Sequence, residues 1–97
     1  MSWVLRITNT VPVSGRLQYL KEAKRITHGL TQNPRIKHLG SYRVAFGNAL
    51  EFMHLFEFES LKDYEETHVP EVCQEMKDIH GSLVEGSRWE WLKPLEK

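Results

Sequence analysis

The sequence has little that would mark a secreted or membrane-bound protein. Its single cysteine, Cys73, cannot form an internal disulfide, which indicates a reducing, cytoplasmic environment. No apolar stretch approaches the ~20 residues that span a bilayer. The first residues follow a strand-like pattern rather than that of a signal peptide. We therefore expect no partnership with a membrane.

An excess of one charge is lacking as well. The chain has 13 basic and 13 acidic residues, so its formal net charge is zero, and no run of lysines and arginines forms a basic patch. Without a positive field there is no electrostatic reason to expect DNA or RNA as a partner. At 97 residues the chain is predicted to be one domain, residues 1–97, whose modest core would gain stability from a partner subunit.

Apolar and polar residues alternate in several segments, which is the pattern of strands. These segments are residues 3–8, 36–46, 50–58 and 88–92. Helical spacing predicts a first helix that starts at Ser14 or Gly15 and ends before Pro34. Its expected apolar stripe comprises Leu17, Leu20, Ile26 and Leu30.

A second helix is predicted from residue 61 onwards, because Ser60 and Asp63 have the spacing of a capping box. Pro70 lacks a backbone donor, so we expect a break near Val69 and a further helical piece that stops at Gly81. The order is then strand, helix, strand, strand, helix, strand. It predicts an α+β domain of the ferredoxin-like βαββαβ type, a four-stranded antiparallel sheet with two helices on one face.

The predicted sheet is apolar on both faces, although two helices can cover only one. Residues 50–58 alternate phenylalanines with a second face that still carries Met53 and Leu55 at its centre. Val4 and Ala45 are expected to add to that second face. We expect a second copy of the chain to cover it, giving a homodimer. The alternative is that the C-terminal segment folds over this face.

A resemblance to the NIPSNAP family runs through residues 47–61, which read GNALEFMHLFEFESL. That family typically has a glycine turn, then a strand of alternating apolar, histidine, leucine and aromatic residues, then a short acidic or serine linker. His54, Leu55, Phe56 and Phe58 match it in register. The resemblance implies the dimeric α/β-barrel fold, but no settled reaction.

Antibiotic-biosynthesis monooxygenases and polyketide cyclases share this fold. In the barrel cyclases a tyrosine and a histidine near the second helix take part in proton transfer. The resemblance therefore makes Tyr64 and His68 catalytic candidates, and they lie one helical turn apart. The alternative is a pair that packs the helix or faces solvent.

His54 is the leading candidate for chemistry. It lies mid-strand between Phe52 and Phe56, where burial favours a neutral imidazole that needs a hydrogen-bond partner. It can act as an acid/base or substrate-orienting group, with Tyr42 or Tyr64 as a second polar group. The alternative is a core histidine bonded to a neighbouring hydroxyl.

Aromatic side chains suggest a site for a small apolar or aromatic metabolite. The candidate ligand-binding residues are Phe52, Phe56, Trp89 and Trp91. A plain core or a dimer seam would use the same residues. No cofactor motif is present, and Cys73, His68 and His80 do not share one helical face, so neither a cofactor nor a metal is expected.

Charged residues are expected on the sheet face opposite the phenylalanines, as ion pairs between subunits or as charges inside the barrel. They are Arg6, Arg43, Glu51 and Glu57. Two functions stay open at this point. One is a homodimeric module that binds a small apolar or aromatic metabolite. The other is a cofactor-free monooxygenase or polyketide-cyclase-like enzyme that uses a buried histidine.

Overall fold

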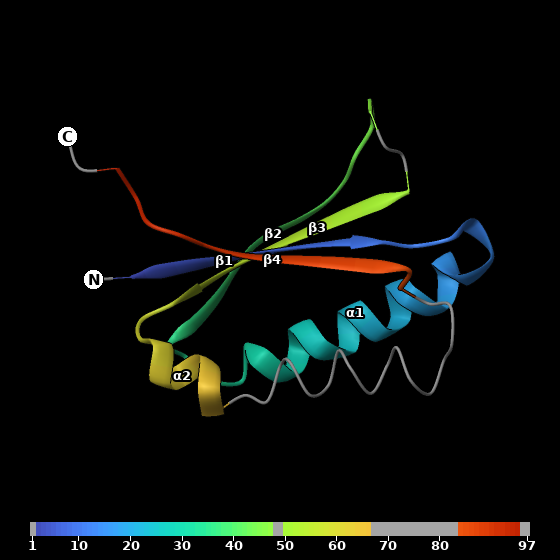
Figure 1. Cartoon of the computed structure of the whole chain (residues 1–97). Helices are drawn as coiled ribbons and strands as arrows, with labels where there is room; N and C mark the ends of the chain where they lie inside the picture. Colours follow the sequence, from blue (N-terminus) through green and yellow to red (C-terminus); the bar gives the residue numbers. More distant parts are fainter. Residues whose placement is uncertain (1, 48–49, 67–83, 96–97) are drawn as a thin grey trace.

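The structure of the chain is a computed structural model, described here for residues 2–47, 50–66 and 84–95. Strands and helices alternate in the predicted order (Figure 1). The elements are β1 (Trp3–Thr10), the 3-10 turn η1 (Val13–Gly15), α1 (Arg16–Leu30), β2 (Ile36–Arg43), β3 (Glu51–Phe58), α2 (Leu61–Glu66) and β4 (Gly86–Leu92).

The four strands form one sheet in the order β2-β3-β1-β4, and each neighbouring pair is antiparallel. Both α1 and α2 lie on the same side of this sheet, and its other side carries no described element (Figure 1). The predicted ferredoxin-like βαββαβ architecture is thus confirmed. We call the two sides of the sheet the helix face and the open face.

The central strand β3 fixes which residues lie on each face. Its burial alternates strictly, with Phe52, His54, Phe56 and Phe58 buried on the helix face. The residues between them, including Met53 and Leu55, lie on the open face and are half-buried. This period of two was the clearest strand pattern in the sequence, and the structure confirms it.

Helix α1 buries part of the predicted stripe, since Ile26 and Leu30 pack into the core but Leu17 and Leu20 do not. Tyr19 and Leu30 are buried, with Ala23 and Ile26 packed against the core beside them, at helical spacings of four, three and four residues. Leu17 is 80% exposed, so its place in the predicted stripe was wrong. Leu20 is exposed too. Both leucines fall on the outer side of the helix because the true stripe is centred on Tyr19 and Ala23.

Strand β2 contains an irregularity that changes the face of every residue after it. His38 pairs with Phe56, but Gly40 already pairs with Leu55, so Leu39 is an extra residue at a β-bulge. Beyond the bulge, Tyr42 lies on the open face and Arg43 on the helix face. The sequence had predicted the opposite face for Arg43.

The end of β2 also falls earlier than predicted. The strand stops at Arg43, so Ala45 lies beyond it and is not part of the open sheet face. Gly47 adopts a φ of 103°, the left-handed region that suits glycine in a turn, but Asn48, its predicted turn partner, lies outside the described residues.

The start of α2 is held by the predicted capping residues. The Asp63 backbone N–H donates to Ser60 Oγ at 3.3 Å, and the Ser60 hydroxyl donates to the Asp63 carboxylate at 2.9 Å. Arg35, at the entry to β2, donates from Nε to both Asp63 oxygens. The predicted break at Pro70 and the stop at Gly81 lie outside the described residues.

Candidate functional site

The core consists of two apolar clusters on the helix face, and His54 lies between them. The larger cluster comprises Leu5, Ile7, Leu30, Ile36, Phe56 and Phe58. The smaller comprises Val11, Tyr19, Phe52 and Val84. Along β3, Phe52 belongs to the smaller cluster and Phe56 to the larger. The buried His54 is therefore a polar residue between two apolar clusters.

Both ring nitrogens of His54 have hydrogen-bond partners. The Tyr19 hydroxyl lies 2.5 Å from Nε2, and the Ser41 hydroxyl lies 2.7 Å from Nδ1. Tyr19 reaches the ring from α1 because it is central to the buried stripe of that helix. Ser41 reaches it from β2 because Ser41 and His54 are direct cross-strand partners.

These contacts continue on the side of Tyr19. The Asn9 amide donates to the Tyr19 hydroxyl at 2.9 Å, and the Ser87 hydroxyl donates to the Asn9 carbonyl oxygen at 2.7 Å. The Trp89 indole N–H donates to Ser87 Oγ at 2.7 Å. Each of these residues lies on the helix face, because Asn9 pairs with Ser87 and with Phe52 across neighbouring strands.

On the other side, Ser41 connects the buried ring to an exposed one. The Ser41 hydroxyl is 2.8 Å from Nε2 of His38, whose ring packs against Phe56 at a centroid distance of 5.1 Å. A continuous line of side chains therefore crosses the whole sheet. We call it the cross-sheet chain, and its members are Trp89, Ser87, Asn9, Tyr19, His54, Ser41 and His38.

The surroundings of His54 keep its ring neutral. Burial, and to a smaller extent the neighbouring His38, lower the pKa of His54 from its ordinary value of 6.5 to about 4. A neutral imidazole accepts at one nitrogen and donates from the other. Since a phenol is the stronger donor, Tyr19 donates to Nε2, and Nδ1–H donates to Ser41.

This arrangement favours hydrogen bonding over acid/base chemistry at His54. At neutral pH the ring carries no charge, and neither nitrogen is free to receive a substrate. The exposed members of the cross-sheet chain are His38 and Ser41 at one end and Ser87 towards the other, and these are the ones that a ligand can reach. The structure therefore matches the alternative of a core histidine bonded to a hydroxyl.

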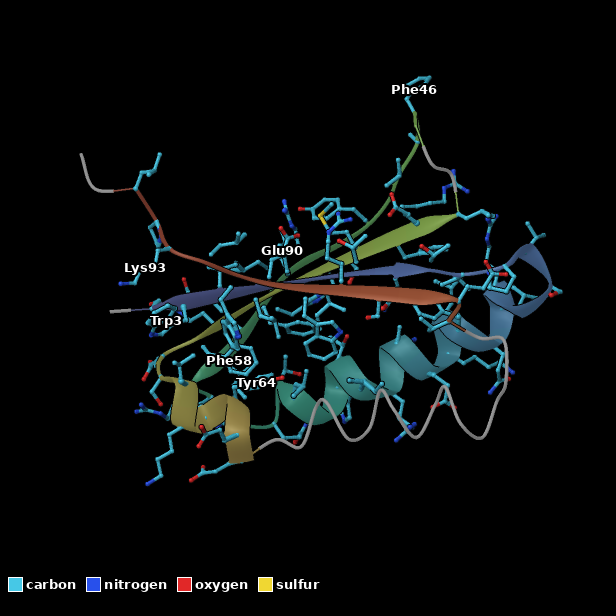
Figure 2. The ribbon with its side chains drawn as sticks, viewed as in Figure 1. Trp3, Phe46, Phe58, Tyr64, Glu90 and Lys93 are labelled. Carbon is cyan, nitrogen blue, oxygen red and sulfur yellow. The ribbon has the colours of Figure 1, made fainter. Side chains whose placement is uncertain are left out.

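The other predicted site residues divide between two places. Tyr42 is 55% exposed on the open face, so the sheet separates it from His54. Tyr64 packs instead against Trp91, at 4.9 Å between ring centroids, and against Phe58 and Trp89 at 5.7 and 6.4 Å. Figure 2 shows Phe58 and Tyr64 between the sheet and the helices.

Phe52 and Phe56 flank His54 as expected, and Trp89 connects both regions, since it belongs to the cross-sheet chain and touches Tyr64. His68 lies outside the described residues. Within residues 2–47, 50–66 and 84–95, no group of three or more His, Cys, Asp or Glu could hold a metal ion. In the same part of the chain, every helix is too short or too polar to cross a bilayer.

Solved structures with the same architecture cover almost the whole chain. A NIPSNAP family protein from Agrobacterium tumefaciens superposes with a TM-score of 0.72 at 18% identity, over 99% of this chain and 95% of the other. The chain has the dimeric α/β-barrel fold. No protein-family model matches the sequence, and no curated protein matches it significantly.

The dimeric α/β-barrel fold is shared by proteins of other description. A candidate antibiotic-biosynthesis monooxygenase from Nitrosomonas europaea superposes with a TM-score of 0.77 at 10% identity, over 97% of this chain and 90% of the other. A protein from Pseudomonas aeruginosa gives a TM-score of 0.80 at 10% identity, over 98% and 95%. Likeness at these identities establishes the fold alone.

Sequence reasoning missed most of the cross-sheet chain. Tyr19, Asn9, Ser87, Ser41 and His38 were not singled out, although each is a polar residue placed on the helix face. One signal was available. Asn9 follows Leu5 and Ile7 at a period of two, so its side chain faces the core and needs a polar partner there.

Proposed function

We propose that the protein is a homodimeric module that binds a small apolar or aromatic metabolite on the helix face. The observation that carries this is a contrast in burial across one sheet face. The residues of β3 on the helix face are buried, whereas their neighbours on β2, His38 and Ser41, are exposed. A ligand beside β2 would meet hydrogen-bonding groups held in place by the cross-sheet chain.

The cross-sheet chain supports binding because it fixes the orientation of these groups beforehand. Ser41 is bonded to two rings at once, and His38 is bonded to Ser41 and stacked on Phe56. A preorganised donor or acceptor loses little conformational entropy when a ligand binds. Phe56 is buried beneath His38 and supports that ring from the core.

Isothermal titration calorimetry with 2-naphthamide, a neutral aromatic probe, tests this proposal. We expect saturable binding that Ser41→Ala weakens by about tenfold, since a hydrogen bond to a ligand typically contributes about 1 kcal/mol and Ser41 also positions His38. Ser14→Ala, an equal change at an exposed position of η1, should have no effect. No heat from either 2-naphthamide or 2-naphthoate would rule the proposal out.

A cofactor-free monooxygenase or polyketide-cyclase-like enzyme is the second candidate. One observation favours it, the continuity of the cross-sheet chain, because a proton received at Nε2 of His54 can leave from Nδ1 towards Ser41 and the exposed His38. Such a relay needs an imidazole at its centre. An enzyme of this kind would lose ~10²–10⁴-fold in turnover on His54→Gln, whereas a binding module would keep its ligand affinity.

The open face supports the homodimer. At the centre of this face, β3 pairs with β1, so that Met53 lies beside Thr8 and Leu55 beside Arg6. All four residues are half-buried or buried. An exposed sheet face with apolar residues at its centre is better explained by a cover than by solvent.

The charges on the open face fit a second copy of the same surface. Arg6 and Glu90 form an ion pair of 2.8 Å, and Glu90 also accepts from Arg88 at 3.2 Å. Figure 2 shows Glu90 on the side of the sheet away from the helices. Both signs of charge lie on one face, so a two-fold axis can bring opposite charges together.

Leu55→Arg tests the homodimer. An unpaired charge buried in the interface should weaken association by about 3–5 kcal/mol, so light scattering should show mostly monomer at micromolar concentration. Leu17→Arg is the matched control, because Leu17 is 80% exposed on α1, and it should remain dimeric. A monomer mass for the unmodified chain would contradict the proposal directly.

A further inference from the structure

Not every arginine of the described chain has an acidic partner. Those that pair with a carboxylate are Arg6, Arg25, Arg35 and Arg88. Arg16 and Arg43 form no ion pair with any described residue. The fold relates both to Phe52, since Arg16 opens α1 beside its ring and Arg43 closes β2 as its cross-strand partner.

Both arginines flank the same aromatic ring. The Arg16 guanidinium carbon lies 5.6 Å from the centroid of Phe52, in the geometry of a cation–π contact. Arg43 is the direct cross-strand partner of Phe52 on the same face. In such a pair the two Cβ atoms are about 5 Å apart, so both guanidinium groups can reach the space over the ring.

Arg16 also has an unmet requirement for an acceptor. Its Nε is buried, and no described residue accepts a hydrogen bond from it. The side chain as a whole is half-buried, so a ligand would meet the terminal guanidinium nitrogens. The cation–π contact with Phe52 holds the guanidinium in place.

The described strands place no carboxylate on the helix face that could compete for these cations. The glutamates of the described strands, Glu51, Glu57 and Glu90, lie on the open face. The ionisable side chains of the strands on the helix face are Arg43, His38 and the neutral His54. On this face the described strands therefore carry the cation Arg43 and no acidic group, although the chain as a whole has no net charge.

We propose that Arg16 and Arg43 form an anion subsite and that the ligand is an aromatic carboxylate. This inference rests on the proposed function, and it narrows the ligand class from apolar or aromatic to anionic. The carboxylate accepts from the two guanidinium groups, which match its planar geometry. Ser41 lies two residues from Arg43 along β2, about 7 Å in an extended strand, so a ring can lie between them.

Titration calorimetry with 2-naphthoate and its neutral isostere 2-naphthamide tests the subsite. We expect 2-naphthoate to bind the unmodified protein about tenfold more tightly than 2-naphthamide. Arg16→Gln and Arg43→Gln should each remove that preference without changing the affinity for 2-naphthamide. Arg88→Gln, which removes a cation from the open face, should leave both affinities unchanged.

The outcomes separate this inference from the proposed function. Equal affinities for the two probes, unchanged in the arginine variants, would overturn the anion subsite and leave the binding module standing. Binding of neither probe would overturn both. Arg43→Gln keeps the test decisive if Arg16→Gln fails to fold, because Arg43 is exposed and its loss disturbs no packing.

Discussion

The burial of His54 predicts how the stability of the protein depends on pH. In the unfolded chain the imidazole takes up a proton below its ordinary pKa of 6.5, whereas in the folded protein it does so only near pH 4. Between these values the unfolded state binds more protons, so unfolding becomes more favourable as the pH falls. The contribution of His54 is complete above pH 6.5 and is lost towards pH 4.

The size of this effect follows from the two pKa values. They differ by about 2.5 pH units, and each unit corresponds to about 1.36 kcal/mol. The free energy of unfolding should therefore fall by about 3 kcal/mol between pH 7 and pH 4. For a chain of this size that is a large part of the total stability.

Urea unfolding at a fixed protein concentration, repeated at intervals between pH 7.5 and pH 4.5, measures this dependence. The matched variant is His54→Gln, whose amide can bond to Tyr19 and Ser41 but does not titrate in this range. The unmodified protein should lose stability steeply below pH 6.5, and the variant should not. Parallel curves for the two proteins would show that His54 is not the group responsible.

Other predictions concern single hydrogen bonds. Tyr19→Phe removes the hydroxyl that joins Asn9 to His54 and should cost about 1–3 kcal/mol in urea unfolding, whereas Tyr42→Phe, at an exposed position, should cost less than about 0.5 kcal/mol. Ser60→Ala removes the cap of α2 and should cost about 1 kcal/mol by the same assay; an unchanged midpoint would mean that the ion pair of Arg35 with Asp63 holds the helix end by itself.

Acid should also weaken the contacts of Asp63. Burial alone would raise the pKa of this carboxyl, but the hydrogen bond from Ser60 and the nearby Arg35 guanidinium outweigh it and hold the pKa below its ordinary value. This contribution is present above the ordinary carboxyl pKa and is lost as the pH falls through the lower, folded value. It therefore acts at lower pH than His54 does.

Local pattern was sufficient for the parts of the fold that depend on one strand or one cap. Residues 50–58 alternate so regularly that both faces of β3 follow from the sequence. Ser60 was identified as a cap because it precedes Asp63 at the spacing of a capping box. The order of the elements then restricts the topology to very few arrangements.

The alternation of apolar and polar residues gave the wrong faces in β2, where a bulge changes the face of every later residue. The bulge at Leu39 moves Tyr42 to the open face and Arg43 to the helix face, and nothing in the local alternation of residues 36–46 indicates where the extra residue falls. The error had a functional consequence. It placed Tyr42 beside His54, where the structure has Ser41, and removed Arg43 from the face that carries the candidate ligand site.

In α1 the sequence predicts part of the buried stripe wrongly, because leucine was favoured over tyrosine and alanine as a buried residue. The apolar spacing correctly predicts Ile26 and Leu30 in the buried stripe. Leu17 and Leu20 lie outside it, however, and Tyr19 and Ala23 lie within it. A tyrosine at a buried helical position is informative, because its hydroxyl needs a partner inside the protein. That partner is His54, and the pairing spans 35 residues of sequence, so neither residue could predict the other without the fold.

The cross-sheet chain has a role in setting strand register that the apolar clusters cannot fill. A slip of one residue in β3 would move its phenylalanines to the open face, but a slip of two keeps them on the helix face. What a slip of two does lose is the set of partners around His54, which costs about 1–3 kcal/mol for the buried Tyr19 hydroxyl. The exposed Ser41 also loses its bond to His54, but water can replace it there. The hydrogen bonds of the cross-sheet chain therefore distinguish strand registers that hydrophobic burial alone leaves nearly equal in free energy. The cost of Tyr19→Phe measures the contribution of one of its members.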